Sequence, residues 1–401
     1  MAIPRNRHGV GALALAVVAG GMFAVSAGSA GSAGAVTVSS SAASTSTAST
    51  STSDGAAFAM TNATNDNRIV SYSRAKTGTL TRKGSISTRG QGIGVDLDTQ
   101  GPLRLSANHQ FLYAVNAGSD NVSVFAVSGT KLKFVQKIYA GDEPTSLTVH
   151  GNLVYVLDGS VASNSIRGFT AGSGGKLTPI AGSIQPLSSP IAVPGDIEFS
   201  PNGKLILVTE KTTANTLNPR IALDAFKVSA TGVAGPAKRD ASAGVRPFAV
   251  AFRNDNQVLV AESYDASAGR AAVSSYKISG TSLRVQSKSV RNHQTDTCWI
   301  IVTHDGRYAY TANFGSGTIS QYTIANNGTV SLTKGNAAFL GPDSQPVDLV
   351  QTGDSHYVYL LLRGTGAVAQ FSVGSSGALT PIGIAHGGLP VADGASGLAV
   401  Y

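Results

Sequence analysis

Nine side chains stand where predicted strands meet turns, and their types suggest proton transfer on an organic acid. They are Asp142, Glu143, Asp158, Glu210, Arg246, Glu262, His293, Asp296 and Cys298. An arginine guanidinium holds a carboxylate through two parallel hydrogen bonds, while a carboxylate or an imidazole accepts or donates the proton. If these residues meet on one surface, they can bind an organic acid and move a proton.

Arg246, Glu262, His293 and Glu210 are the predicted catalytic residues. Arg246 in GVRPFAV supplies the carboxylate clamp, and either Glu262 in LVAESYD or His293 in RNHQTDTCW is the base. The alternative for the two glutamates is structural, because they occupy a repeat position where other copies carry Asn or Asp. A side chain at that position can simply hydrogen-bond a turn. Both interpretations stay open at this stage.

Cys298 and Trp299 are the only cysteine and the only tryptophan of the chain, and they begin a predicted inner strand. A catalytic thiol needs a base beside it, and His293 is the candidate. A lone cysteine is more often a small buried apolar residue, and space is tight where inner strands converge. We therefore interpret Cys298 as scaffold first.

The sequence predicts no metal and no cofactor. The segment DLDTQG, Asp96–Gly101, begins like a calcium loop but has Ala107 where the bidentate glutamate would fall. There is no His-x-x-x-His or paired-cysteine spacing for zinc. The glycines of GQGIG, residues 90–94, precede no helix that would bind a phosphate, and no Gly-x-Ser-x-Gly nucleophile elbow occurs.

The elements that must position these side chains repeat about every fifty residues. Each of seven copies holds two alternating apolar strands around a Gly/Ser/Asn turn, then a third strand such as GKLTPIAGSI and a short one such as PGDIEFSPNGK. The residues that end the first strand of each pair are Asn62, Asn116, Asp158, Glu210, Glu262, Asn313 and Leu362. Four short strands per copy are typical of a β-propeller.

The predicted fold is therefore an all-β, seven-bladed β-propeller with four-stranded blades. Period-two alternation indicates strands half buried between neighbouring sheets, and Asn-Gly in SPNGK and Asp-Gly in THDGR suit two-residue hairpins. The competing architecture, a parallel β-helix, has repeats shorter than about fifty residues. The C-terminal strand in ASGLAVY is expected to pair with AAFAM near the start and to close the ring, which removes exposed sheet edges.

The N-terminal part predicts export. Residues 1–34 have the order of a signal peptide, with cleavage between about 27 and 35. Residues 35–54 are a Ser/Thr/Ala-rich linker with too few apolar groups to fold, and residues 55–401 form the propeller. No second apolar stretch approaches the ~20 residues that span a bilayer. The mature protein is expected to be secreted and extracellular.

The charge and the cysteine content limit which partners the protein can bind and how its fold can be stabilised. The net charge of +8 falls to +6 without Arg5 and Arg7, because residues 1–53 hold no other charged side chain. The remaining basic residues form no cluster, so nucleic-acid binding is not expected. One cysteine cannot form an internal disulfide, so packing must stabilise the fold. We expect a monomer.

The repeats FLYAVNAGSDNVSVFAV, GRYAYTANFGSGTISQYTI and GKLTPIAGSI resemble the lactonase-type seven-bladed propellers. That group includes bacterial phosphogluconolactonase and the fungal carboxymuconate lactonising enzyme. The resemblance covers Ala57 to Tyr401 and implies a site of His, Arg and Glu side chains around the mouth of the central channel. The Pro-His-x-His-type run of the phosphogluconolactonases is absent, and QTDTCWIIV and TANFGSG stand in its place.

Two functions of different classes follow. The first is an enzyme that hydrolyses or forms a lactone, or isomerises an organic acid, at the channel mouth. The second is a non-catalytic extracellular module that binds a ligand or a protein with the same face, because propeller mouths are concave and ringed by variable loops. The expected small-molecule partner is an organic acid or its lactone.

Overall fold

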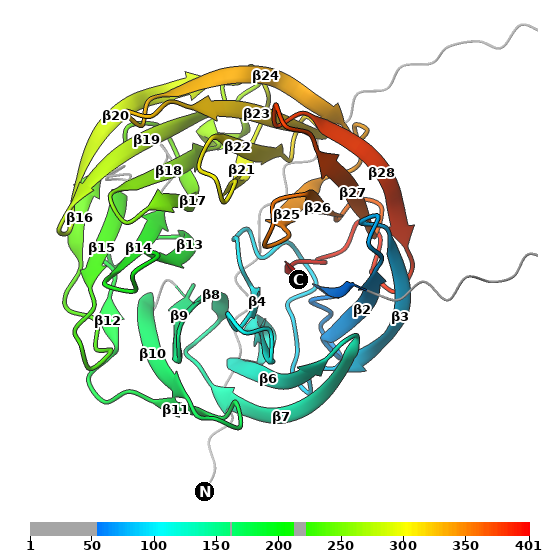
Figure 1. Cartoon of the computed structure of the whole chain (residues 1–401). Coiled ribbons are helices and arrows are strands. Elements are labelled where there is room, and N and C mark those ends of the chain that lie inside the picture. The colour runs from blue at the N-terminus through cyan, green and yellow to red at the C-terminus, as the bar shows by residue number, and fades with distance from the viewer. Residues whose placement is uncertain (1–53, 161–162, 212–221) are drawn as a thin grey trace, which may run out of the picture. The chain divides into compact units, whose positions relative to one another are not determined.

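Seven antiparallel sheets form a closed ring in a computed structural model that describes residues 54–160, 163–211 and 222–401 (Figure 1). The prediction of an all-β, seven-bladed β-propeller is confirmed. The signal peptide and all of the linker except Asp54 lie outside the described residues, so both stay predictions. No helix among the described residues is long and apolar enough to cross a membrane.

The blades are numbered 1 to 7 from the one that contains the first strand. Their innermost strands are β29 (Leu398–Val400), β4 (Leu103–Leu105), β8 (Pro144–His150), β13 (Pro194–Phe199), β17 (Pro247–Asn254), β21 (Thr297–Val302) and β25 (Pro346–Gln351). The second strands are β1 (Gly55–Met60), β5 (Phe111–Asn116), β9 (Leu153–Asp158), β14 (Leu205–Glu210), β18 (Gln257–Glu262), β22 (Tyr308–Asn313) and β26 (Tyr357–Leu362).

The outer half of each blade completes the four-stranded sheet. The third strands are β2 (Arg68–Arg74), β6 (Asn121–Ser128), β10 (Ser165–Ala171), β15 (Ala222–Lys227), β19 (Ala272–Ser279), β23 (Thr318–Ile324) and β27 (Ala367–Val373). The outermost strands are β3 (Leu80–Ser87), β7 (Lys131–Tyr139), β11 (Leu177–Pro179) with β12 (Gln185–Pro186), β16 (Lys238–Ala241), β20 (Ser282–Arg291), β24 (Val330–Phe339) and β28 (Leu379–His386).

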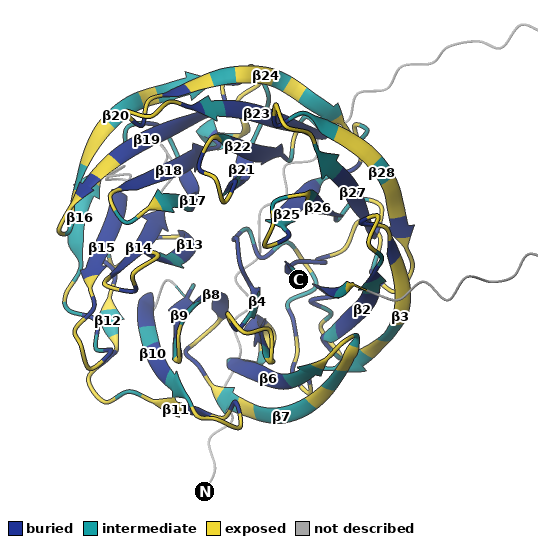
Figure 2. Cartoon of the chain, in the orientation of Figure 1, coloured by how far each residue is buried: buried dark blue, intermediate teal, exposed yellow. Residues whose placement is uncertain are grey.

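Burial follows the position of a strand in its blade (Figure 2). Every residue of β14 is buried, because the second strands pack between two neighbouring sheets. The outer strand β7 consists only of exposed and partly buried residues. This gradient explains why the apolar alternation was strong enough to predict the blades.

Tyrosines in second strands tie neighbouring blades together. Tyr155 Oη donates to the Gly232 carbonyl at 2.7 Å, Tyr310 Oη to Gly377 at 2.6 Å and Tyr359 Oη to Gly78 at 2.7 Å. Each accepting glycine lies in the outer hairpin of the next blade and has a positive φ of 73° to 82°. The glycines of these outer hairpins therefore accept hydrogen bonds from neighbouring blades and also allow tight turns.

The C-terminal strand closes the ring, as predicted. In blade 1, β29 pairs antiparallel with β1, with Phe58 opposite Ala399 and Ala59 opposite Leu398. Arg74 Nε donates to the Tyr401 carbonyl at 3.0 Å, which holds the last residue against β2. Closure covers the edge of β1 and gives blade 1 four strands like the other blades.

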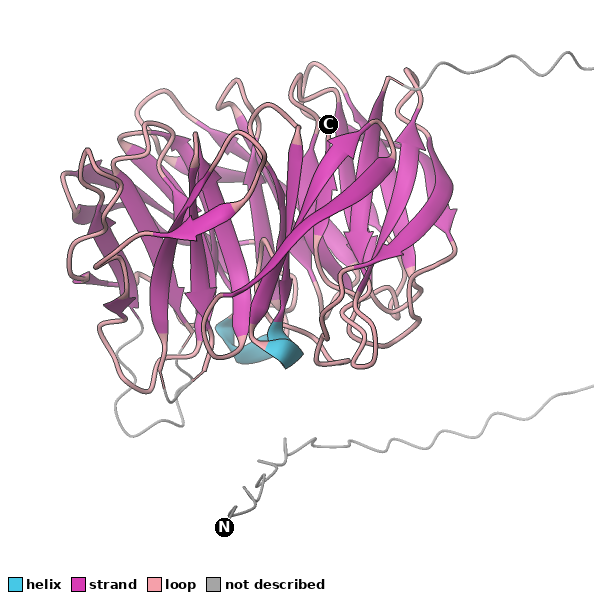
Figure 3. Cartoon of the chain, turned by 90° about the horizontal axis from the view of Figure 1, so that it is seen from below, coloured by secondary structure: helices cyan, strands magenta, loops and turns pink. Residues whose placement is uncertain are grey.

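The ring has two faces. The loop face carries the loops before each inner strand and after each second strand, including the 3-10 helices η1 (Ala117–Ser119) and η2 (Tyr264–Ala266), which lie at the lower edge of Figure 3. The hairpin face carries the tight turns that join first and second strands. The ionisable residues singled out by the sequence lie in loops and at strand ends of the loop face, as expected from the strand order.

One loop crosses the central channel. The segment Asp96–Gly101 between β3 and β4, here called the axial segment, runs through the middle of the ring (Figure 1, cyan). Gln100 N donates to the Gly195 carbonyl of blade 4 at 3.1 Å, and Gln100 Oε1 accepts from Ile300 N of blade 6 at 2.9 Å. Gly101 N donates to Asp348 of blade 7 at 3.2 Å. The axial segment therefore divides the channel into a loop side and a hairpin side.

Candidate functional site

Two cations share one carboxylate on the loop side of the axial segment. Lys211 Nζ lies 2.7 Å from Asp98 Oδ2, and Arg246 Nη2 lies 2.7 Å from the same oxygen. Lys211 Nζ also donates to the Asp98 carbonyl. We call this group, with its neighbours, the mouth cluster; its members are Asp96, Asp98, Lys211, Arg246, Asp296 and Cys298. The cluster gathers residues from the axial segment and from the starts or ends of strands in blades 4, 5 and 6.

A repeated left-handed turn aims the mouth-cluster side chains. Arg246 directly precedes β17 with φ 52°, and Asp296 directly precedes β21 with φ 60°. Glu143 and Gln345 occupy the same position before β8 and β25, with φ 65° and 45°. Non-glycine residues rarely adopt this conformation and do so most often at functional sites. The turn belongs to the scaffold, whereas the residue types placed on it differ from blade to blade.

Lys211 is a buried cation. Its side chain is 1% exposed, and its ammonium lies 4.5 Å from the centre of the Phe248 ring. Burial lowers the pKa of Lys211, and the attraction of Asp98 offsets this only in part. Burial alone would raise the pKa of Asp98, but Lys211 and Arg246 outweigh it and hold that pKa below its usual range. Asp98 is therefore ionised at neutral pH.

The other two carboxyls of the cluster hold their protons more tightly. Burial, together with repulsion from Asp98, raises the pKa of Asp96 to about 6. Its Oδ1 accepts from the Asp98 amide at 2.9 Å. Burial also raises the pKa of Asp296 above its usual value. The cluster thus combines the ionised carboxylate of Asp98 with Asp96, whose pKa is about 6, and with Asp296, whose pKa is raised by burial.

Cys298 faces Asp296 rather than a base that would activate it. Its thiol lies 3.3 Å from Asp296 Oδ1, and the residue is 2% exposed. Burial and the nearby carboxylates raise the pKa of the thiol well above its ordinary value. A thiol that stays protonated is a hydrogen-bond donor and not a nucleophile, which agrees with the structural interpretation.

Trp299 anchors the axial segment beneath the cluster. Its Nε1 donates to the Thr99 carbonyl at 3.1 Å, and its ring packs 5.0 Å from Phe248. A buried indole N–H needs such a partner. Trp299, near the start of β21, thus fixes the axial segment next to the mouth cluster.

The structure brings only part of the predicted set together. Arg246, Asp296 and Cys298 belong to the mouth cluster, whereas His293 lies exposed in the same loop with φ 61° and has no side-chain bond to another described residue. Asp158 accepts from the amides of Asp142 and Ser160, each at 3.0 Å, and so holds a turn of blade 3. Glu143 lies in that same turn.

Glu262 is sealed inside blade 5. It has no exposed surface, and its carboxyl accepts from Ser274 Oγ and, at 2.7 Å, from Ser289 Oγ. A Cβ atom at Gly244 would lie 1.9 Å from Glu262 Oε2, so only glycine fits there. Burial raises the pKa of Glu262 to about 7. Its catalytic role stays a prediction that no contact with the mouth cluster supports.

Glu210 is equally enclosed. Its Oε1 accepts from Ser188 Oγ and from Ser189 N, each at 3.1 Å, and the residue has no exposed surface. Burial and the neighbouring Asp224 raise the pKa of Glu210 to about 8. These bonds hold the loop before β13, which is the turn-holding alternative that the sequence left open. The catalytic role of Glu210 therefore also stays a prediction.

Three members of the cluster were missed by sequence reasoning. Asp96 and Asp98 were considered only as calcium ligands, and Lys211 was not considered at all. A signal was present in LILVTEK, since a lysine directly after a strand with the apolar run LILV needs a partner if it is buried. Among the described residues, no group of three or more His, Cys, Asp and Glu side chains is arranged to hold a metal ion.

The sequence matches one protein family, described as lactonase with a seven-bladed β-propeller, over residues 56–194 and 222–348. The first matched segment contains Asp96 and Asp98, and the second contains Arg246, Asp296 and Cys298. Lys211 lies between the two segments. No curated protein matches the chain.

Solved structures share the fold at low identity. A protein from Bacteroides uniformis, provisionally described as a 6-phosphogluconolactonase, superposes with a TM-score of 0.67 at 16% identity, covering 87% of this chain and 100% of that one. A similar protein from Bacteroides fragilis gives 0.62 at 17% identity, with 88% and 99% covered. The periplasmic gluconolactonase of Pseudomonas aeruginosa gives 0.64 at 13%, with 86% and 98% covered. At such identities the likeness concerns the fold.

Proposed function

Because the chain belongs to the lactonase family of seven-bladed β-propellers, we propose that it hydrolyses the lactone of a small organic acid at the mouth cluster. The observation that carries this proposal is the position of Lys211 and Arg246, which both lie 2.7 Å from one carboxylate oxygen. Hydrolysis of a lactone passes through an oxyanion, and preorganised cationic donors stabilise such an oxygen in a site that excludes water.

Arg246 is the donor best placed to reach a substrate. Its side chain is 24% exposed, whereas that of Lys211 is 1% exposed. Asp98 holds the Arg246 guanidinium through Nη2, and Asp265 lies 3.9 Å from Nη1. The edge of the guanidinium that faces the loops can therefore receive the lactone carbonyl while Asp98 stays in place. Lys211 then acts as a positioning residue.

Asp96 is the proposed general base. With a pKa of about 6 it is mostly ionised at neutral pH, yet it is basic enough to take a proton from water. The resulting hydroxide adds to the lactone carbonyl, and the intermediate collapses by breaking the bond to the ring oxygen. That oxygen leaves as an alkoxide and takes the proton back from Asp96. The product is the open hydroxy acid, whose carboxylate Arg246 can bind.

A second function, binding without turnover, rests on one specific observation. Because Asp98 already neutralises part of the charge of both cations, Arg246 can hydrogen-bond an organic acid but gives weaker stabilisation to an oxyanion. The absence of the Pro-His-x-His-type run points the same way.

One experiment separates the two functions. Protein comprising residues 36–401 is assayed in a pH-stat against γ-lactones, δ-lactones and sugar lactones, together with Arg246→Gln and Asp96→Asn. Loss of one oxyanion donor is expected to lower kcat about 10²-fold to 10³-fold. Arg284→Gln, an exposed arginine of β20, is the matched control and should retain full activity.

The pattern of results decides the proposal. Turnover that rises as the pH passes about 6 and disappears in Asp96→Asn supports the enzyme. Turnover equal in the wild type and Arg246→Gln contradicts the assignment of the site. Absence of turnover, with calorimetric binding of an organic acid that Arg246→Gln abolishes, establishes the binding function instead.

We also propose that the protein is exported as a monomer. The support is the N-terminal pattern of residues 1–34 and the periplasmic location of the Pseudomonas aeruginosa gluconolactonase that shares the fold. Protein collected from outside the cytoplasm should begin between about residues 28 and 36, as read by N-terminal sequencing. A chain that still begins at residue 1 after fractionation contradicts export, and light scattering tests the monomer.

A further inference from the structure

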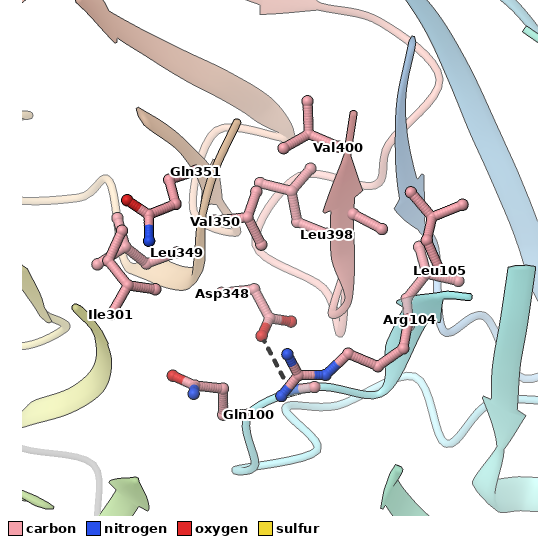
Figure 4. Close-up of a pocket in the computed structure, with 13 residues that line it drawn as sticks. Gln100, Arg104, Leu105, Ile301, Asp348, Leu349, Val350, Gln351, Leu398 and Val400 are labelled. Carbon is pink, nitrogen blue, oxygen red and sulfur yellow. Dashed lines mark hydrogen bonds between the residues drawn. The ribbon is translucent and has the colours of Figure 1, made fainter. Parts of the chain in front are cut away.

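A cavity lies on the hairpin side of the axial segment. It has a volume of about 280 Å³ and is lined by the inner strands β4, β21, β25 and β29 (Figure 4). Gln100 and Gly101 form its floor, so the axial segment separates it from the mouth cluster. Leu105, Val350 and Val400 stand at the far ends of their strands and are partly exposed, which places the opening on the hairpin face.

Arg104 is the cationic side chain that lines this cavity, and Glu198 neutralises its charge. Its Nη2 lies 2.5 Å from Glu198 Oε2, and the two side chains are 28% and 23% exposed. Figure 4 shows Arg104 reaching from β4 toward Asp348. Arg104 Nη2 bonds Glu198, and Arg104 Nε is buried without a partner, so Nη1 is the donor left for a ligand.

The neighbouring carboxyls do not make the cavity attractive to anions. Asp348 accepts from Gly101 N at 3.2 Å and from Gly397 N at 2.5 Å, and burial raises its pKa to about 6. Asp196 has no exposed surface, and burial and Glu198 raise its pKa well above the usual value. An entering carboxylate would therefore compete with Glu198 and be repelled by Asp348.

The opposite wall of the cavity is hydrocarbon. It consists of Ile301, Leu105, Val350, Leu398 and Val400. In Figure 4, Val350 lies beside Leu398 and Val400. The space equals roughly nine water molecules at about 30 Å³ each. A cavity with hydrogen-bonding groups at one end and an apolar wall suits a small amphipathic ligand.

We propose that the hairpin-side cavity is a binding site for a small uncharged ligand with a polar carbonyl or hydroxyl head and a short hydrocarbon tail. The head accepts from Arg104, while the tail packs on Leu105, Leu398 and Val400. This site is independent of the mouth cluster, because it lies beyond the axial segment and uses none of the same side chains. Selection rests on charge, since Glu198 keeps Arg104 from attracting anions.

Three probes of one shape and different charge test the proposal. Hexanamide, hexanoate and hexylammonium are titrated by calorimetry and saturation-transfer NMR into protein comprising residues 36–401 at pH 7.5. Hexanamide is expected to bind at least tenfold more tightly than hexanoate. Hexylammonium should bind more weakly than the amide, because an ammonium cannot accept a hydrogen bond from Arg104. Leu105→Phe fills the cavity and should weaken hexanamide binding at least tenfold.

Two further variants keep the test decisive. Glu198→Gln frees Arg104 and should bring hexanoate binding up to or above that of hexanamide. Arg246→Gln, on the other side of the axial segment, should leave hexanamide binding unchanged, and melting curves verify that each variant is folded. A wild type that prefers hexanoate, that binds none of the probes, or whose hexanamide binding survives Leu105→Phe would overturn the proposal.

Discussion

The two halves of the central channel are built on the same ring of inner strands but hold their charges differently. On the loop side, Lys211 is 1% exposed and shares Asp98 with Arg246. On the hairpin side, Arg104 is paired with Glu198, and both keep about a quarter of their surface exposed. The loop side is therefore filled with ion pairs, while the hairpin side keeps an open cavity of about 280 Å³.

The difference follows from where each residue stands on the blade. Arg246 and Asp296 lie in turns before the inner strands, and such surface loops vary more freely than strands. Arg104 and Asp348 lie within inner strands, so pairing fixes their directions and packing limits their neighbours. Polar side chains are thus easiest to vary on the loop side, whereas the inner strands of the hairpin side hold their side chains in fixed directions.

Deleting residues 395–401 should have the largest effect and should damage the hairpin side first. The deletion removes β29, which pairs with β1 and supplies Leu398 and Val400 to the cavity wall. It also opens the ring and exposes a strand edge. We expect a loss of at least about 5 kcal/mol, comparable with the whole stability of a domain. Soluble protein with an unchanged melting temperature would contradict ring closure.

Asp98→Asn and Glu198→Gln compare the two ion pairs directly. Removing the charge of Asp98 leaves the buried Lys211 uncompensated, which should cost about 3 kcal/mol of the free energy of unfolding. Removing Glu198 leaves a partly exposed Arg104, for which about 1 kcal/mol is expected after solvent screening. Urea unfolding of both variants at pH 7 measures the difference. Equal losses would show that the two halves are electrostatically alike.

The fold was predictable because its signals repeat. Seven similar copies made the strand count robust, and the pairing of β29 with β1 followed from a strand missing before the first copy and an additional strand after the last one. Arg246 was found because its residue type stood out before a predicted inner strand. Asp98 could not be found in this way, since it meets Lys211 and Arg246 only through a loop that crosses the channel, and no repeat encodes that path.

Glu262→Gln should distinguish a role in the blade interior from a role in the channel. Its effect on the free energy of unfolding should depend on pH. The pKa of Glu262 is raised from 4.5 to about 7, so the folded state binds its proton more tightly than the unfolded state does. The stabilising contribution of protonated Glu262 in the wild type is therefore fully present below pH 4.5 and is lost as the pH rises through about 7. Glutamine should raise the free energy of unfolding by up to about 3 kcal/mol at pH 8.

The measurement for Glu262→Gln is urea unfolding between pH 4 and pH 8, together with lactone turnover. Turnover should be retained, because the residue has no exposed surface and contacts Ser274 and Ser289 instead of the mouth cluster. Turnover abolished in a variant that stays folded would restore Glu262 as the predicted base. It would also weaken the assignment of that role to Asp96.

The smallest effect is expected from His293, at the outer edge of the loop side. Its imidazole is exposed, so His293→Asn should change the free energy of unfolding by less than about 0.5 kcal/mol. Asparagine tolerates the left-handed backbone at φ 61°, so the loop keeps its shape. If turnover in the pH-stat also stays within twofold of the wild type, proton transfer belongs to the channel mouth. A loss of 100-fold or more without a change in stability would instead move the base from Asp96 to this loop.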